Sequence, residues 1–149
     1  MKPLCLLAAL LLTGTSLAFA ATPSARPSKP APVPAPYLTI DHSNATLVGA
    51  NTARDIWQEA LPASLMKLYP LKKWGFVTEV EGGFDEAKVC VITARAMMLP
   101  RSGKTLVFQP AKTATAFGIH TGATNQQCQD LAKAKLLEAI VAVRSSLLR

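Results

Sequence analysis

The stretch LPASLMKLYP, Leu61–Pro70, holds two residue types that can act together in acyl transfer. Lys67 follows Ser64 by three positions, and on a helix residues three apart lie on the same face. A lysine held beside a serine hydroxyl can take its proton and activate the oxygen as a nucleophile. The pattern therefore raises the hypothesis of a serine acyl-enzyme, and the rest of the chain must supply the other parts of such a site.

Ser64 and Lys67 in PASLMK resemble the serine–lysine motif of penicillin-binding proteins and serine β-lactamases, and HTG at 120–122 resembles that family's later strand motif. The family places an asparagine-bearing motif between the two stretches. Residues 52–124 contain no asparagine here, and the whole chain is far shorter than that fold. We therefore expect Ser64 and Lys67 to be exposed helical side chains, with the acyl-enzyme kept as an alternative.

The remaining residues that could do chemistry are few. Ser102–Thr105, SGKT, ends like a phosphate-binding loop, but the first glycine of that motif would fall at Met98, so we expect a hairpin turn. The two histidines, His42 and His120, supply little general acid–base or metal-binding chemistry. We therefore predict a non-enzymatic protein with no catalytic residue, no metal site and no cofactor.

The start of the chain indicates export. Residues 1–20 match a secretory signal peptide, with Lys2, a short apolar run that contains Cys5, and small residues before a cleavage site at Ala21. Leu4–Leu12 is too short to cross a bilayer, which takes about 20 apolar residues. We expect a periplasmic or secreted protein that keeps no transmembrane segment after processing.

Two further parts follow the signal peptide. Residues 21–36, ATPSARPSKPAPVPAP, are rich in proline and poor in large apolar side chains, so they predict an extended, semi-rigid spacer. Residues 37–149 have the length of a single small domain.

Cys90 and Cys128 remain after processing, and an even pair in an oxidising compartment usually forms a disulfide, although two buried free thiols are an alternative. Thr124 and Gln127 predict a capping box for a helix from Asn125 to about Leu148. Because a disulfide holds its Cα atoms within about 7 Å, one stripe of this helix must lie on the Cys90 face of its strand. The stripe consists of Cys128, Ala132, Leu136, Ile140, Val143 and Leu147.

Changes in apolar periodicity predict the other elements. A helix capped at Thr52 should end at Pro62, and alternation predicts strands from Trp74 to Glu81, Lys88 to Leu99 and Thr105 to Ile119, the last disturbed by Pro110. Residues 37–50 contain two short β-prone pieces. The expected fold is therefore α+β, a small α-β-β-β-α domain in which an antiparallel three-stranded meander packs on helices and carries one disulfide.

This fold leaves one sheet face uncovered unless residues 37–50 fold over it. Apolar side chains there are either additional core or a protein-binding surface. Basic residues on and beside the second hairpin could adjoin that face and form a positive surface. The candidate partner surface consists of Val89, Val91, Arg95, Met97, Arg101, Lys104 and Lys112.

The chain carries a net charge of +7, which falls to +6 when Lys2 is removed with residues 1–20. The basic residues predict either a solvated face or a positive surface that meets an acidic protein or another polyanion. Nucleic acid is not expected, because the chain has an export signal and lacks a strand-borne aromatic platform. The leading hypothesis is a small exported, non-enzymatic protein-binding module of the cell envelope, either an accessory factor or an inhibitor or immunity-type protein. The alternative is a structural or anchoring envelope protein that contacts wall or membrane polyanions.

Overall fold

The computed structural model describes residues 37–149. The predicted signal peptide, residues 1–20 with cleavage before Ala21, and the predicted spacer, residues 21–36, lie outside the described residues. Within the described part of the chain, no helix combines the length and apolar character that a membrane crossing requires.

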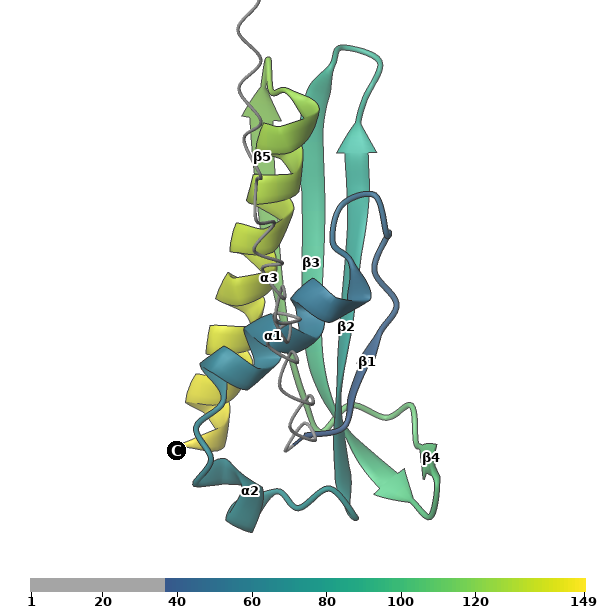
Figure 1. Ribbon diagram of the computed structural model, residues 1–149, viewed down its shortest axis with the longest axis vertical. Helices are drawn as coiled ribbons and strands as arrows, with labels where there is room; N and C mark the ends of the chain where they lie inside the picture. Colours follow the sequence, from purple (N-terminus) through teal and green to yellow (C-terminus); the bar gives the residue numbers. More distant parts are fainter. Residues whose placement is uncertain (1–36) are drawn as a thin grey trace, which may run out of the picture. The chain divides into compact units, whose positions relative to one another are not determined.

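Four strands lie side by side in the order β1 (Thr39–Asp41), β2 (Trp74–Phe84), β3 (Val89–Ser102) and β5 (Lys112–Thr121) (Figure 1). The strands β2, β3 and β5 form an antiparallel meander, as predicted. The short β1 pairs parallel with β2 and adds an edge strand to the meander. The predicted α+β fold is therefore confirmed, with a mixed rather than purely antiparallel sheet.

The third predicted strand is divided in two. A short β4 (Thr105–Leu106) pairs with the end of β3, and Pro110 lies in the loop before β5. A proline cannot donate to a strand ladder. The predicted disturbance at Pro110 is therefore confirmed as a break between β4 and β5. Gly103 turns the β3–β4 hairpin with a φ of 61°, and this confirms that SGKT is a hairpin turn.

Helices α1 (Ala50–Ala60) and α2 (Leu65–Leu68) occupy the region before the meander. The predicted cap at Thr52 is wrong, because α1 already begins at Ala50 with Gly49 as its N-cap and no side-chain cap. Val48 is buried in the core two residues before Ala50, so packing of Val48 rather than a side-chain cap positions the start of the helix. The end of α1 before Pro62 agrees with the prediction.

Helix α3 (Asn125–Leu147) follows β5 and begins with the predicted capping box. The Thr124 hydroxyl accepts a hydrogen bond from the Gln127 backbone N–H at 3.2 Å, and the Gln127 Oε1 accepts one from the Thr124 N–H at 2.8 Å. This arrangement satisfies N–H groups that a helix start leaves unpaired, and it places Cys128 in the first turn.

Helices α1 and α3 cover the same face of the sheet, and the main core lies between them and the strands (Figure 1). Trp57 of α1 is fully buried against Phe76 of β2, with ring centroids 4.8 Å apart. The predicted stripe of α3 is buried in this core, together with the Cys90 face of β3. Cys90 and Cys128 form the predicted disulfide, with their Cα atoms 5.7 Å apart. The docking of α3 is therefore confirmed.

The segment from Tyr37 to Ala50 contributes mainly to the helix-covered face. Tyr37, Leu47 and Val48 are buried in the main core on the helix side. The Tyr37 hydroxyl donates a hydrogen bond to the Pro62 carbonyl at 2.7 Å, and burial raises the pKa of this hydroxyl. The segment therefore lies mainly on the helix side, and the alternative in which it covers the free face holds only for Ile40, which packs against the cluster of Val77, Met97 and Leu99 on that face.

Candidate protein-binding surface

The sheet face that the helices leave free has one covered half. Leu106 of β4 packs on Gly75 of β2, where a Cβ would come within 2.7 Å of a Leu106 methyl carbon. The β4 hairpin therefore folds over this half and closes a second, smaller cluster. Its members are Val77, Met97, Leu99, Ile40 and Leu106.

Met97 belongs to this cluster and is only 3% exposed. The expectation that it contributes to a partner surface is therefore wrong. The reason is the coverage by Ile40 and Leu106, which come from β1 and β4 rather than from the strands next to Met97 in the chain. The sequence left two interpretations of the apolar side chains on the free face, additional core or a protein-binding surface. For the half that contains Met97, additional core is confirmed.

The other half of the free face is exposed and apolar. On this half Val91 of β3 lies opposite Ile119 of β5, and Thr93 lies opposite Phe117. Side chains paired across strands lie about 5 Å apart, so these residues form a continuous surface. Phe117 is 57% exposed and Ile119 is 59% exposed. We call this region the open apolar surface, and it consists of Val89, Val91, Phe117 and Ile119.

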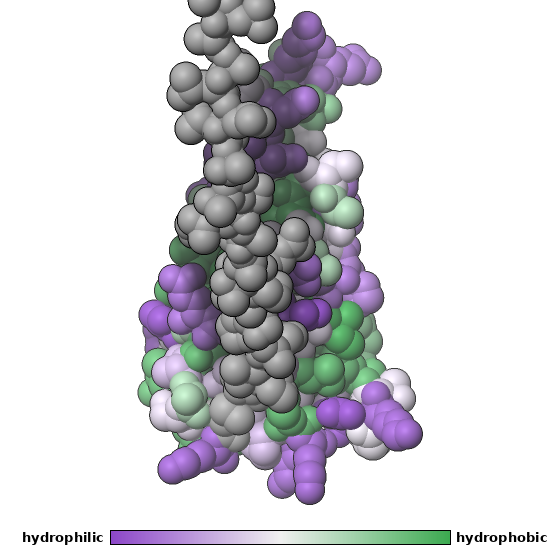
Figure 2. Space-filling view, viewed as in Figure 1, coloured by the Kyte–Doolittle hydropathy of each residue, from purple (hydrophilic) through white to green (hydrophobic). Residues whose placement is uncertain are grey.

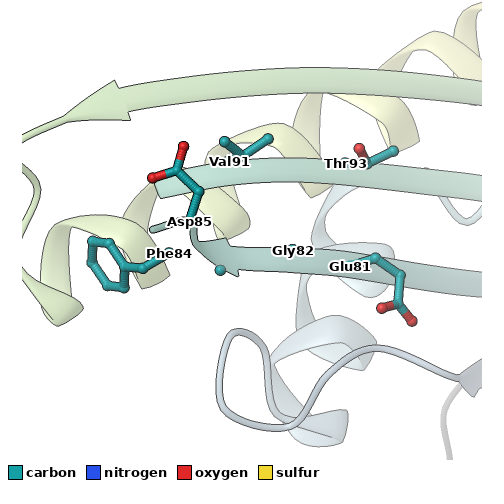
Figure 3. Close-up of a pocket in the computed structure, with 7 residues that line it drawn as sticks. Glu81, Gly82, Phe84, Asp85, Val91 and Thr93 are labelled. Carbon is teal, nitrogen blue, oxygen red and sulfur yellow. The ribbon is translucent and has the colours of Figure 1, made fainter. Parts of the chain in front are cut away.

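A shallow hollow of about 390 Å³ adjoins the open apolar surface at the end of β2. Figure 3 shows Val91 and Thr93 on the same side of β3, with Asp85 beside Val91. Gly82 has a φ of 126°, and a Cβ on it would collide with the Val91 carbonyl oxygen. Glycine at this position therefore allows β2 and β3 to approach while leaving the hollow without a side chain.

Two arginines of the candidate partner surface are already engaged within the domain. Arg95 lies on the free face and forms an ion pair with Glu79, with 3.2 Å between Nη1 and Oε2. Arg101 is half-buried and donates from Nη1 to the Leu71 carbonyl at 3.0 Å. Arg101 therefore supports the loop before β2 rather than extending freely into solvent.

The two lysines of that surface lie in different places. Lys104 is exposed in the β3–β4 turn. Lys112 lies opposite Met98, whose side chain belongs to the helix-covered face, while Arg95 lies on the other face. The four basic residues therefore do not gather on one face. Figure 2 shows hydrophilic side chains at both ends of the helix-covered side rather than in a single patch.

Ser64 and Lys67 are both exposed at the short α2, with Ser64 as its N-cap. His120–Gly122 lies at the end of β5, at the opposite end of the sheet from α2 (Figure 1). The structure does not bring together the two stretches that resemble the penicillin-binding family. Within residues 37–149, no group of three or more His, Cys, Asp or Glu side chains is placed to hold a metal ion.

A second apolar hollow of about 450 Å³ lies between α1 and α3. Ile56 of α1 and Leu137 of α3 form its walls, and Leu137 is 46% exposed. Lys133 and Arg144 line it as well, and Arg144 donates to the Ala60 carbonyl at 3.2 Å. This hollow is on the helix side, so it is separate from the open apolar surface.

Phe117 and Ile119 were not identified among the candidate surface residues from sequence. A signal was present, because the alternate residues Ala114, Ala116 and Gly118 are all small. A Cβ on Gly118 would lie 3.0 Å from Leu131 and Lys135 of α3, so small residues mark the side beneath the helix. Their large neighbours in β5 must then face away from the helix.

No known family profile and no curated protein matches this chain. Among solved structures, the chain is similar to a "putative lipoprotein" from Caulobacter crescentus CB15, with 11% identity and a TM-score of 0.45. The similarity covers 76% of this chain and 88% of that chain. At this level of similarity we transfer neither a function nor a cellular location to this chain.

Proposed function

We propose that this chain is a small exported, non-enzymatic protein-binding module of the cell envelope, acting as an accessory factor or an inhibitor or immunity-type protein. The observation that carries the proposal is the exposure of Phe117 and Ile119 beside Val91 on a free sheet face. Contiguous exposed apolar side chains commonly mark protein-binding sites, and aromatic side chains are enriched in interfaces. The open apolar surface is therefore the proposed contact.

The disulfide supports a location outside the cytoplasm. Disulfides persist in oxidising compartments and are rare in the cytosol, and the Cys90–Cys128 bridge joins β3 to α3 within the main core. Together with the signal-like start of the chain, this favours a periplasmic or secreted protein.

The expected partner is a protein that is acidic around an apolar contact. The full sequence has a charge of +7, which falls to +6 when Lys2 is removed with the signal peptide; this positive charge attracts such a protein over distance, and burial of Phe117 and Ile119 would supply affinity. The proposal includes no cofactor, no metal and no nucleic acid.

The test is affinity capture from an envelope extract of the source organism with the exported full chain, washed at low and high salt. We expect one stoichiometric protein to survive high salt with the native chain and to be lost with Phe117→Lys. Leu137→Lys is the matched control, because it adds the same charge at an exposed apolar residue on the helix side.

Loss of the partner with Leu137→Lys alone would assign binding to the hollow between α1 and α3 and contradict the proposed surface. Recovery of wall or lipid material only, released as salt rises, would contradict the protein-binding function and favour the anchoring alternative.

A further inference from the structure

The outer edge of β5 presents backbone hydrogen-bonding groups whose positions follow from the sheet register. On β2, the Phe76 N–H donates to the Leu38 carbonyl at 2.8 Å, and the Thr78 and Val80 carbonyls each accept a bond from the β1 side at 2.9 Å. The even-numbered residues of β2 therefore bond toward β1. Because backbone groups alternate along a strand, its odd-numbered residues bond toward β3.

The same alternation extends to β5. Val77 of β2 lies opposite Met97, so the odd-numbered residues of β3 bond to β2 and the even-numbered ones bond to β5. Ala94 of β3 lies opposite Ala116, so the even-numbered residues of β5 bond to β3. The odd-numbered residues therefore direct their N–H and C=O groups outward, and these residues are Thr113, Thr115, Phe117, Ile119 and Thr121. In the described part of the chain, β3 is the single strand that pairs with β5.

The residues with outward backbone groups are also those with side chains on the free face. None of the five is charged, and all are threonine, phenylalanine or isoleucine, which favour strands. Proteins commonly protect an edge strand with charges, proline, a bulge or short length. β5 is ten residues long, with Lys112 at its first position and Pro110 outside it. The hydrogen-bonding edge and the open apolar surface thus coincide.

We propose that β5 binds an extended segment of another protein by strand addition, an inference that rests on the proposed function. Main-chain hydrogen bonds to the five outward residues would hold the segment, and its alternate side chains would lie beside Phe117 and Ile119. We expect the side chains of the segment that lie beside Phe117 and Ile119 to be β-branched or aromatic. The intervening side chains of the segment would lie on the side of Lys112 and His120, so we expect them to be acidic or neutral.

A second copy of the chain fits this edge less well than an acidic segment. Two copies would each bring a net positive charge into the contact. Antiparallel pairing of two β5 strands would also bring the Lys112 and His120 sides of both copies together.

The test uses the isotope-labelled full chain and the peptide acetyl-Glu-Val-Glu-Val-Glu-Val-Glu-Val-amide, with amide hydrogen exchange measured by NMR. We expect the peptide to slow exchange at Thr115, Phe117 and Ile119 by at least about tenfold, with smaller changes at Ala114 and Ala116. The matched control is the same peptide with every amide N-methylated, which keeps the side chains and removes the donors.

Two variants of the chain provide an independent measurement. Thr115→Pro removes one outward N–H, and it should weaken peptide binding by about tenfold or more. Thr115→Val retains that N–H, and it should bind within about twofold of the native chain.

Peptide binding without slowed exchange at the outward residues, while Phe117→Lys still abolishes capture of the partner, would overturn strand addition and leave the proposed function intact. Absence of peptide binding at about 1 mM would overturn the proposed segment chemistry. Protection of the outward residues that rises with protein concentration alone would assign the edge to a second copy.

Discussion

The two edges of the sheet are built in opposite ways. At one edge β1 is three residues long, and the backbone beyond it still bonds to β2, since the His42 and Asn44 N–H groups donate to the Thr78 and Val80 carbonyls. Past this point β2 continues into Gly82, which has a positive φ. At the other edge β5 runs for ten residues, and within residues 37–149 no strand lies on its outer side.

Within residues 37–149, the difference between the two edges shows that exposed apolar side chains and unpaired backbone groups are tolerated at β5 but not at β1. A long apolar edge invites aggregation, and natural proteins usually block it. Here the β1 edge is blocked by short length, by continued pairing and by glycines with unusual backbone angles, whereas the β5 edge carries Phe117 and Ile119 in the open. The proposed binding role at β5 would account for an edge that residues 37–149 leave unprotected.

Removal of the disulfide should have the largest effect on stability, and it should act mainly on the β5 side. The bridge spans a sequence separation of 38, which corresponds to roughly 3 to 4 kcal/mol in the chain-entropy estimate. We expect Cys90→Ala with Cys128→Ala to lower the free energy of unfolding by about this amount in urea titrations. Hydrogen exchange should rise in β5 and α3 more than in β1.

The native chain treated with a reducing agent is the control, and it should show a similar loss of stability. A double variant as stable as the oxidised native chain would contradict the importance of the bridge. Equal loss of protection in β1 and β5 would show that the two edges do not depend on α3 to different degrees.

Alanine at the two glycines of β2 should separate steric contact from backbone strain at the protected edge. Both Gly82 and Gly83 have positive φ, which costs about 1 to 3 kcal/mol for another residue. At Gly82 a Cβ would also meet the Val91 carbonyl, whereas at Gly83 it would meet no atom within 4 Å. We expect Gly82→Ala to be the more destabilising by at least about 1 kcal/mol in urea titrations. Equal effects would mean that strain alone acts there.

Sequence reasoning predicted the elements that a local or covalent rule determines. The capping box at Thr124, the break at Pro110 and the docking of α3 through Cys128 each followed from chemistry contained in a few residues. The parallel pairing of β1 did not, because a three-residue strand is placed by tertiary packing rather than by its own propensity.

The candidate surface could be predicted only in part, for the same reason. Val91 followed from alternation along β3, but Met97 on the same face is covered by Leu106, whose position depends on how the β4 hairpin folds over. The exposure of Phe117 depends on the other end of the face, where no segment of residues 37–149 provides such coverage.

Tyr37→Phe should have a moderate effect at the β1 edge. The variant loses the hydrogen bond to the Pro62 carbonyl but keeps the ring against Phe76, with centroids 5.5 Å apart, so we expect a loss of about 1 kcal/mol. Burial raises the pKa of the Tyr37 hydroxyl above its unfolded value of about 10. The contribution of the Tyr37 hydroxyl to the free energy of unfolding is therefore complete below about pH 10. It is lost as the pH rises toward the raised pKa of the folded state.

Urea titrations from neutral to alkaline pH check this prediction. The stability difference between native and Tyr37→Phe chains should shrink above about pH 10. A difference that stays constant across this range would contradict a buried, un-ionised hydroxyl at Tyr37.

The smallest effect on stability is expected at the β5 edge itself, and it is the sharpest test of the contrast. Ile119→Thr exchanges one β-branched residue for another at a side chain that is 59% exposed, so the free energy of unfolding should change by no more than about 0.5 kcal/mol. Val77→Thr is the matched substitution on the covered half of the same face, where the side chain is 2% exposed, and it should cost about 1 to 3 kcal/mol. Urea titrations of both variants, with binding of a fluorescent apolar dye as a second readout, measure the difference. A large loss of stability at Ile119 would mean that the open apolar surface is required for folding, and the β5 edge would then need an explanation other than a partner.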